Sequence, residues 1–262
     1  LIIDEEQHFG VRQKEKIKEL RSNIHILTLT ATPIPRTLQL ALVGVREMSL
    51  IATPPSNRLG IDTFILPYDP LIIRRVMMRE MKRGGQIFFV CPRIKDITDI
   101  HKKLKKMFPE IKITVAHGQM SPKQLDRAML DFYQGDSDLL LSTSIIESGL
   151  DIPKTNTIII YRADLFGLSQ LHQLRGRVGR SATKAYAYLT YSEESNLSSS
   201  GKKRLEVINK LDSLGVGFSL ASYDLDIRGA GNLLGAEQSG HIREVGVELY
   251  QEMLREAVSD LK

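Results

Sequence analysis

The sequence predicts an α/β fold built on a parallel sheet. Short apolar segments alternate along the chain with longer segments that have helical periodicity. Several apolar segments, among them residues 87–90 and 139–141, lack polar alternation, which is typical of strands buried on both faces. Strands that alternate with helices in this way favour parallel pairing through right-handed crossovers.

Each element follows from this pattern in order along the chain. We expect strands at residues 1–3, 25–30, 63–68, 86–91, 113–116, 139–143, 157–161 and 185–191. We expect helices at residues 10–21, 35–43, 70–83, 96–107, 122–133, 169–178, 202–214 and 242–261, of which the last is amphipathic. Ser121 precedes Pro122 and is expected to cap the helix that begins there.

Two breaks divide the chain. A Pro-rich linker at residues 53–62 separates a partial first lobe at 1–52 from a complete second lobe at 63–191. A loop rich in Ser and Glu then opens a third part at 192–262, in which the strand pattern stops. The chain begins on an interior-type strand, with neither an initiator Met nor a signal peptide, so we expect a fragment of a longer protein.

The composition excludes several classes of protein. No apolar run is long enough to span a membrane, and a single cysteine excludes a disulfide framework and Cys-rich zinc modules. One cysteine also fits a reducing compartment. The net charge of +5 and the pI of about 9.2 permit nucleic-acid binding without requiring it. An aromatic content of 6% is low for a protein that binds bases by stacking.

Two candidate motifs lie in the first lobe. Asp4 follows an apolar strand, where open α/β sheets bind ligands, and its carboxylate suits Mg²⁺. The neighbouring Glu5 could orient or deprotonate an attacking water, although an ordinary acidic loop is the simpler interpretation of these residues alone. Residues 28–36 place small hydroxyl side chains at a strand end, where they could relay hydrogen bonds; alone, they indicate only a turn before a helix.

A third motif occupies residues 143–153. Gly149 permits close approach of the backbone to a ligand, and Asp151 could accept a hydrogen bond from a ribose hydroxyl. Thr143 could bind a nucleic-acid phosphate. The alternative is a loop that needs its glycine and proline for turns.

The fourth motif, residues 170–180, contains two arginines. Arg177 and Arg180 are three residues apart, so a helical turn would place their guanidinium groups on one face. Two such groups suit a triphosphate, because Arg binds phosphate bidentately and offsets transition-state charge. The alternative is a basic turn exposed to solvent.

In this order on one α/β chain, the motifs resemble those of superfamily 2 helicases and translocases. Residues 4–7 resemble motif II, 30–32 motif III, 143–153 motif V and 173–180 motif VI. The resemblance implies a RecA-like fold in which two lobes bind ATP and Mg²⁺ between them while nucleic acid crosses both lobes.

Residues 203–240 restrict the resemblance to a smaller group of superfamily 2 proteins. The segments 224–235 and 237–240 resemble the translocation module shared by RecG-type fork-remodelling helicases and bacterial transcription-repair coupling factors, and their form is closer to the coupling factors. This implies that the part at 192–262 contains a helical hairpin, which passes ATP-driven lobe movement to double-stranded DNA.

The resemblance also implies a role for each matching residue. Asp4 would hold Mg²⁺ and Glu5 would activate water, and both would be catalytic together with Arg177 and Arg180. The other roles are nucleotide contact by Gln7, Gly149, Asp151 and Gln173, coupling by Thr30, Thr32, Arg204, Arg228 and Gln238, and DNA contact by Thr143 and His117.

Two features depart from the family pattern. Gln7 and His8 stand where His-Arg is expected, and no Gly-rich P-loop with its lysine is present. Because the P-loop supplies half of the family's ATP site, we expect little or no ATP hydrolysis by this chain alone. Outside the motifs, Cys91 is expected to be a buried apolar residue and residues 102–106 a solvated helix face, and the histidines lack metal-ligand spacing.

The expected function is part of an ATP-driven translocase on double-stranded DNA in the bacterial cytoplasm, which displaces stalled RNA polymerase and couples transcription to DNA repair. RNA polymerase and a nucleotide-excision-repair protein would bind regions outside this chain. The alternatives are a RecG-type fork-remodelling helicase and, in another class, a non-catalytic DNA-binding module that keeps a helicase lobe as its scaffold.

Overall fold

The chain divides into two compact units in the computed structural model. Unit 1 comprises Leu1–Thr53 and Leu214–Lys262, and unit 2 comprises Pro54–Ser213. The structure describes residues 1–5, 9, 16–17, 24–30, 49, 51, 59–147, 152–192, 197–210 and 223. Of the helices predicted at 10–21, 35–43 and 242–261, only residues 16–17 are described, and these two are helical.

Unit 1 contains a pair of parallel strands. β1 (Ile2–Asp4) pairs with β2 (Leu27–Leu29), and the register places Asp4 beside Leu29. Strands were predicted at both places. Because the two strands run in the same direction, their carboxyl ends meet, and the residues that follow them become neighbours.

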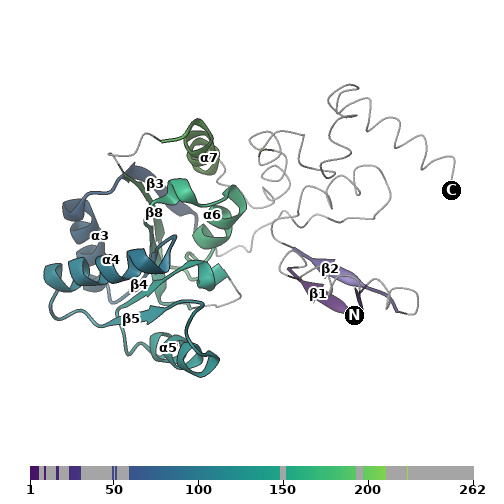
Figure 1. The fold of residues 1–262 in the computed structure, drawn as a ribbon, viewed down its shortest axis with the longest axis horizontal. Coiled ribbons are helices and arrows are strands. Elements are labelled where there is room, and N and C mark those ends of the chain that lie inside the picture. The colour runs from purple at the N-terminus through teal and green to yellow at the C-terminus, as the bar shows by residue number, and fades with distance from the viewer. Residues whose placement is uncertain are drawn as a thin grey trace. The chain divides into compact units, whose positions relative to one another are not determined.

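Unit 2 is built on a sheet of six parallel strands in the order β3-β8-β7-β4-β6-β5 (Figure 1). The strands are β3 (Ile61–Pro67), β4 (Gln86–Val90), β5 (Ile113–Ala116), β6 (Leu139–Ser142), β7 (Thr155–Ile160) and β8 (Ala185–Tyr191). All six were predicted, with boundaries within two residues. The parallel sheet that the apolar strands indicated is therefore confirmed.

Helices lie between these strands and, in the case of α7, after the last of them. They are α3 (Pro70–Lys82), α4 (Ile94–Met107), α5 (Pro122–Gln134), α6 (Leu168–Arg175) and α7 (Ser199–Lys210), with short 3₁₀ turns η2 (Ser144–Glu147) and η3 (Ala163–Leu165). The predicted cap is confirmed, because the Ser121 side chain accepts a hydrogen bond from the Gln124 backbone and Gln124 bonds back to Ser121. Gly135 ends α5 in the left-handed conformation, with φ of 88°.

Helices cover both faces of the sheet, and β4 demonstrates it. Ile87 and Phe89 belong to the core that β4 forms with buried residues of α3 and α4. Phe88 points to the other face, where the centroid of its ring lies 5.4 Å from the ring centroid of Phe132 on α5. Figure 1 shows the corresponding layers, with α3 and α4 on one side of the sheet and α5 and α6 on the other. Burial on both faces explains why these strands are apolar without alternation.

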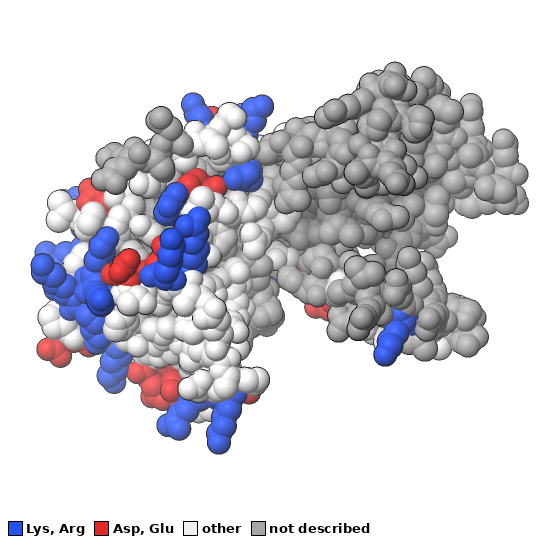
Figure 2. Space-filling model, viewed as in Figure 1, with Lys and Arg blue, Asp and Glu red and all other residues white. Residues whose placement is uncertain are grey.

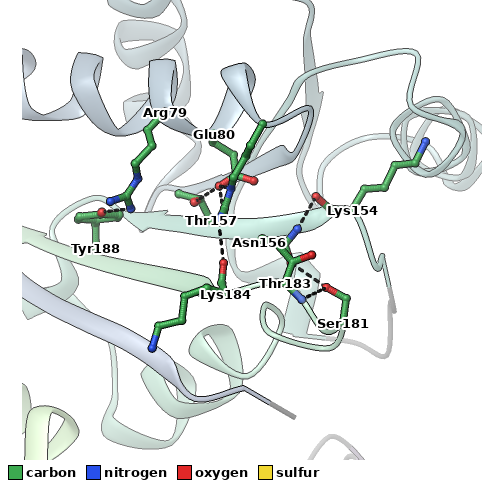
Figure 3. Close-up of polar contacts among 10 residues, drawn as sticks. Arg79, Glu80, Lys154, Asn156, Thr157, Ser181, Thr183, Lys184 and Tyr188 are labelled. Carbon is green, nitrogen blue, oxygen red and sulfur yellow. Dashed lines mark hydrogen bonds and ion pairs between the residues drawn. The ribbon is translucent and has the colours of Figure 1, made fainter. Parts of the chain in front are cut away.

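A fully buried glutamate ties α3 to the sheet (Figure 3). The Glu80 carboxylate is paired with Arg83 and accepts a hydrogen bond from the Thr157 hydroxyl of β7. Arg83 also donates to the main-chain oxygen of Lys184, 2.8 Å away, immediately before β8. One carboxylate therefore fixes the end of α3 against the beginnings of two strands.

We predict that Glu80→Gln destabilises the chain by about 1–3 kcal/mol, because it removes a buried charge that two donors share. The midpoint of urea unfolding, followed by circular dichroism, measures this loss. Glu206→Gln on α7 is the matched control, since Glu206 is exposed. Equal midpoints for the two variants would contradict the structural role of Glu80.

Candidate functional site

The acidic motif and the hydroxyl motif of unit 1 come into contact. Asp4 is exposed at the end of β1. Glu5 follows it with φ of 50°, an uncommon conformation for a residue other than glycine, and its backbone N–H donates to the Leu29 carbonyl over 2.9 Å. The Thr30 hydroxyl donates to Oε2 of Glu5 over 3.3 Å. Two hydrogen bonds thus join motifs that lie about 25 residues apart in sequence.

Of the residues predicted to act in unit 1, the structure describes Asp4, Glu5 and Thr30. The carboxylates of Asp4 and Glu5 are the described groups that could take part in hydrolysis. Oxygen ligands of this kind suit Mg²⁺, which proteins bind through one or two carboxylates plus phosphate oxygens. Among the residues that the structure describes, no group of three or more His, Cys, Asp or Glu could hold a metal ion by itself. Two carboxylates fit a Mg²⁺ ion whose remaining ligands are phosphate oxygens and water. Gln7 and Thr32 lie outside the described residues.

Two predicted DNA-contacting residues lie side by side at the carboxyl edge of the unit 2 sheet. His117 follows β5 and Thr143 follows β6, and the preceding residues of these neighbouring strands, Ala116 and Ser142, pair in register. The Thr143 N–H donates to the Ala116 carbonyl over 3.3 Å. The buried Nδ1 of His117 has no hydrogen-bond partner among the described residues, nor has the Ser142 hydroxyl. This edge is where ligands bind in open α/β sheets.

The arginine motif departs from the helical geometry that its spacing predicted. α6 ends at Arg175, whereas the predicted helix continued to residue 178. Arg177 and Arg180 therefore lie in the turn that follows, and no helical face joins them. Gly179, which stands between the two arginines, has a φ of 72°, a value that no right-handed helical turn contains, and a Cβ added there would lie 2.9 Å from Cγ1 of Ile61.

The two arginines of this turn differ in exposure. Arg177 is only 8% exposed, whereas Arg180 is exposed and its Nε donates to the Gly176 carbonyl over 3.1 Å. Gly179 packs against Ile61 and Ala185, the first residues of β3 and β8. The arginine turn therefore lies at the amino edge of the sheet, at the opposite ends of the strands from Thr143 and His117.

Two arginines fasten α7 to the segment around α6. Arg204 Nη2 donates to the Asp164 carbonyl in η3 over 2.9 Å. Arg175, which is buried at the end of α6, donates through Nη1 to the Ile208 carbonyl over 3.0 Å. Sequence reasoning singled out Arg204 but missed Arg175, although its place directly before Gly176 in the arginine motif was a usable signal.

The remaining predicted site residues are only partly described. Gln173 lies on α6 and is half-buried. Gly149, Asp151, Arg228 and Gln238 lie outside the described residues. Of the part at 192–262, which was expected to contain a helical hairpin, the structure describes residues 192, 197–210 and 223, including α7.

Residues interpreted as structural behave as expected. Cys91 is fully buried, and this burial raises the pKa of its thiol. The run Lys102–Lys106 exposes all four of its lysines, and Figure 2 shows basic side chains, with some acidic ones between them, over the side of unit 2 that carries α3 and α4. Among the described helices, none is long and apolar enough to cross a membrane.

Comparison with known proteins identifies the fold of unit 2. Residues 70–182 match the helicase conserved C-terminal domain family. The structure of RecG bound to a three-way DNA junction is 33% identical, with a TM-score of 0.70 over 97% of this chain and 33% of that chain. Dbp5 of S. cerevisiae bound to RNA and ADP BeF3 is 16% identical, with a TM-score of 0.58 over 87% of this chain and 63% of that one, and supports the fold alone.

Curated relatives match the whole chain. The transcription-repair-coupling factor of Rickettsia prowazekii (strain Madrid E) is 56% identical over all 262 residues, which are 23% of that protein. Those of Escherichia coli (strain K12) and Bacillus subtilis (strain 168) are 52% and 51% identical over the same residues, which are 23% and 22% of their lengths. The chain thus spans less than a quarter of these relatives, and it belongs to the transcription-repair-coupling factor family, in the RecG-like group of superfamily 2.

Proposed function

We propose that this chain is part of an ATP-driven translocase on double-stranded DNA, which displaces stalled RNA polymerase and thereby couples transcription to DNA repair. The observation that carries the proposal is the identity of 51–56% with transcription-repair-coupling factors over every residue of the chain. The identity with RecG is lower, at 33%. Coupling of transcription to repair is therefore favoured over fork remodelling, which stays as the second candidate.

The hydrolytic step would use both arginine and carboxylate chemistry. Asp4 would hold Mg²⁺, whose charge offsets that of the nucleotide phosphates, and Glu5 would orient the attacking water. Arg177 and Arg180, supported by Gln173, would stabilise charge on the transferring phosphoryl group. Gly149 and Asp151 would contact the nucleotide, as would Gln7.

The coupling step is supported by two contacts. The Thr30 hydroxyl binds the carboxylate proposed to activate water, so a change at Glu5 during hydrolysis would change the hydrogen bond to Thr30. In unit 2, Arg204 and Arg175 hold α7 against η3 and α6, so movement of the arginine turn would move α7 with it. Thr32, Arg228 and Gln238 would carry the movement further, to duplex DNA bound through Thr143 and His117.

We predict that Arg180→Ala and Arg228→Ala separate hydrolysis from movement in a full-length protein that carries this sequence. Arg180→Ala should lower DNA-dependent ATP hydrolysis by about 10³-fold or more, because an arginine that stabilises a transferring phosphate contributes this much. Arg228→Ala should keep most of the ATPase and lose translocation, measured by displacement of a triplex-forming strand. Normal translocation by Arg228→Ala would contradict the proposed module.

We predict that Thr30→Val lowers the number of triplexes displaced per ATP hydrolysed, because it keeps the shape of threonine and removes the hydroxyl that binds Glu5. Phosphate release and triplex displacement are measured in the same reaction. Thr98→Val, at an exposed position on α4, is the matched control. An unchanged ratio in Thr30→Val would leave the Thr30 contact without a coupling role.

We predict that the full-length protein releases RNA polymerase stalled on duplex DNA when ATP is present, and that the Arg228→Ala variant does not. Release is followed by the loss of labelled transcript from immobilised DNA. If the wild type hydrolyses ATP in response to DNA but releases no polymerase, regression of a synthetic fork is tested next, and activity there would favour fork remodelling.

A further inference from the structure

The turn that carries Arg180 is anchored to β7 by a chain of side-chain hydrogen bonds (Figure 3). The Ser181 hydroxyl donates to Oδ1 of Asn156 over 3.1 Å. The same hydroxyl accepts from the Thr183 N–H over 3.3 Å, which closes a local turn. Asn156 Nδ2 donates to the Lys154 carbonyl over 3.2 Å, so the amide that receives Ser181 is itself held in orientation.

The neighbouring residues are fixed as well, on either side of Arg180. Before it, Gly179 fits against Ile61 with no room for a side chain. After it, Lys184 pairs through Nζ with Asp62 of β3 over 2.9 Å. Arg180 lies between these anchors and is exposed, whereas Asn156 is only 5% exposed.

Asn156 lies on β7 directly before the residue that ties α3 to the sheet. Gln86 pairs with Thr155 and Ile87 pairs with Thr157, so Asn156 is the extra residue of a bulge in β7. The next residue, Thr157, binds Glu80 of α3. Asn156 binds the arginine turn instead. Ser181→Ala removes the hydrogen bond to Asn156 and leaves the side chains of Thr157 and Glu80 unchanged.

We propose that Asn156 and Ser181 are positioning residues, which hold the backbone at Arg180 so that its guanidinium meets the transferring phosphate in one place. This inference rests on the proposed ATP hydrolysis. Neither residue contacts the phosphate; both act through Arg180. A displacement of about 1 Å at a reacting centre costs up to ~10²-fold in rate, so loss of one anchor of the turn is expected to be measurable.

The test uses the full-length protein and steady-state, DNA-stimulated ATP hydrolysis. Ser181→Ala should lower kcat by about three- to tenfold with KM for ATP within about twofold of the wild type, because the misplaced guanidinium loses transition-state contacts. Ser181→Thr keeps the hydroxyl and should restore kcat. Ser199→Ala, at an exposed position on α7, is the matched control and should behave as wild type.

Asn156→Ala tests the other partner of the bond. Combined with Ser181→Ala, it should lower kcat no further than the stronger single variant, because both remove the same hydrogen bond. Thermal unfolding of each variant accompanies the kinetics, and a common midpoint assigns the loss of kcat to positioning.

Three outcomes would overturn the inference. They are a kcat for Ser181→Ala within twofold of the wild type, an equal loss in Ser181→Thr, and additive losses in the double variant. Failure of the proposed function looks different, because the wild type would then hydrolyse no ATP in response to DNA, or Arg180→Ala would be as active as the wild type; either result would also overturn the inference.

Discussion

Burial of both faces of the parallel sheet is the constraint on which the rest of unit 2 depends. The helices α3 and α4 cover one face, and α5 and α6 cover the other, so β4, β6 and β7 are buried along their whole lengths. Polar side chains in such strands need hydrogen-bond partners, as Thr157 finds in Glu80. Residues that meet ligands can therefore lie only where the strands begin and end.

The two ends of the strands carry different chemistry. Thr143 and His117 follow adjacent strands at the carboxyl edge, while the turn with Arg177 and Arg180 lies at the amino edge. The helix α6 links the two edges, because it returns the chain from the end of β7 to the beginning of β8. Its neighbour α7 is fastened near both ends of this path, to Asp164 and to Arg175. These contacts join η3, α6 and α7 within unit 2, next to the arginine turn.

Much of the fold could be predicted from the sequence because local patterns determine it. Apolar runs identified all six strands of unit 2, and the Ser121-Pro122 pair identified the start of α5. The motifs also identified the family. The contact between Glu5 and Thr30, by contrast, is a finding of the structure, in which β1 and β2 pair in parallel and end together. The arginine motif is the exception. Its three-residue spacing suggested a helical face, but Gly179 between the two arginines adopts a left-handed conformation that interrupts any helix there.

The sequence by itself determined the succession of strands and helices along the chain, the apolar core and the types of side chain available for phosphate and magnesium chemistry. These features depend on periodicity and composition. Only the tertiary structure decided that Asn156 receives Ser181, that Arg175 reaches Ile208, and that Glu80 joins α3 to β7. Each of these contacts joins residues 25 to 77 positions apart, and no local pattern encodes such a contact. Strand order and helix packing bring these partners within hydrogen-bond distance.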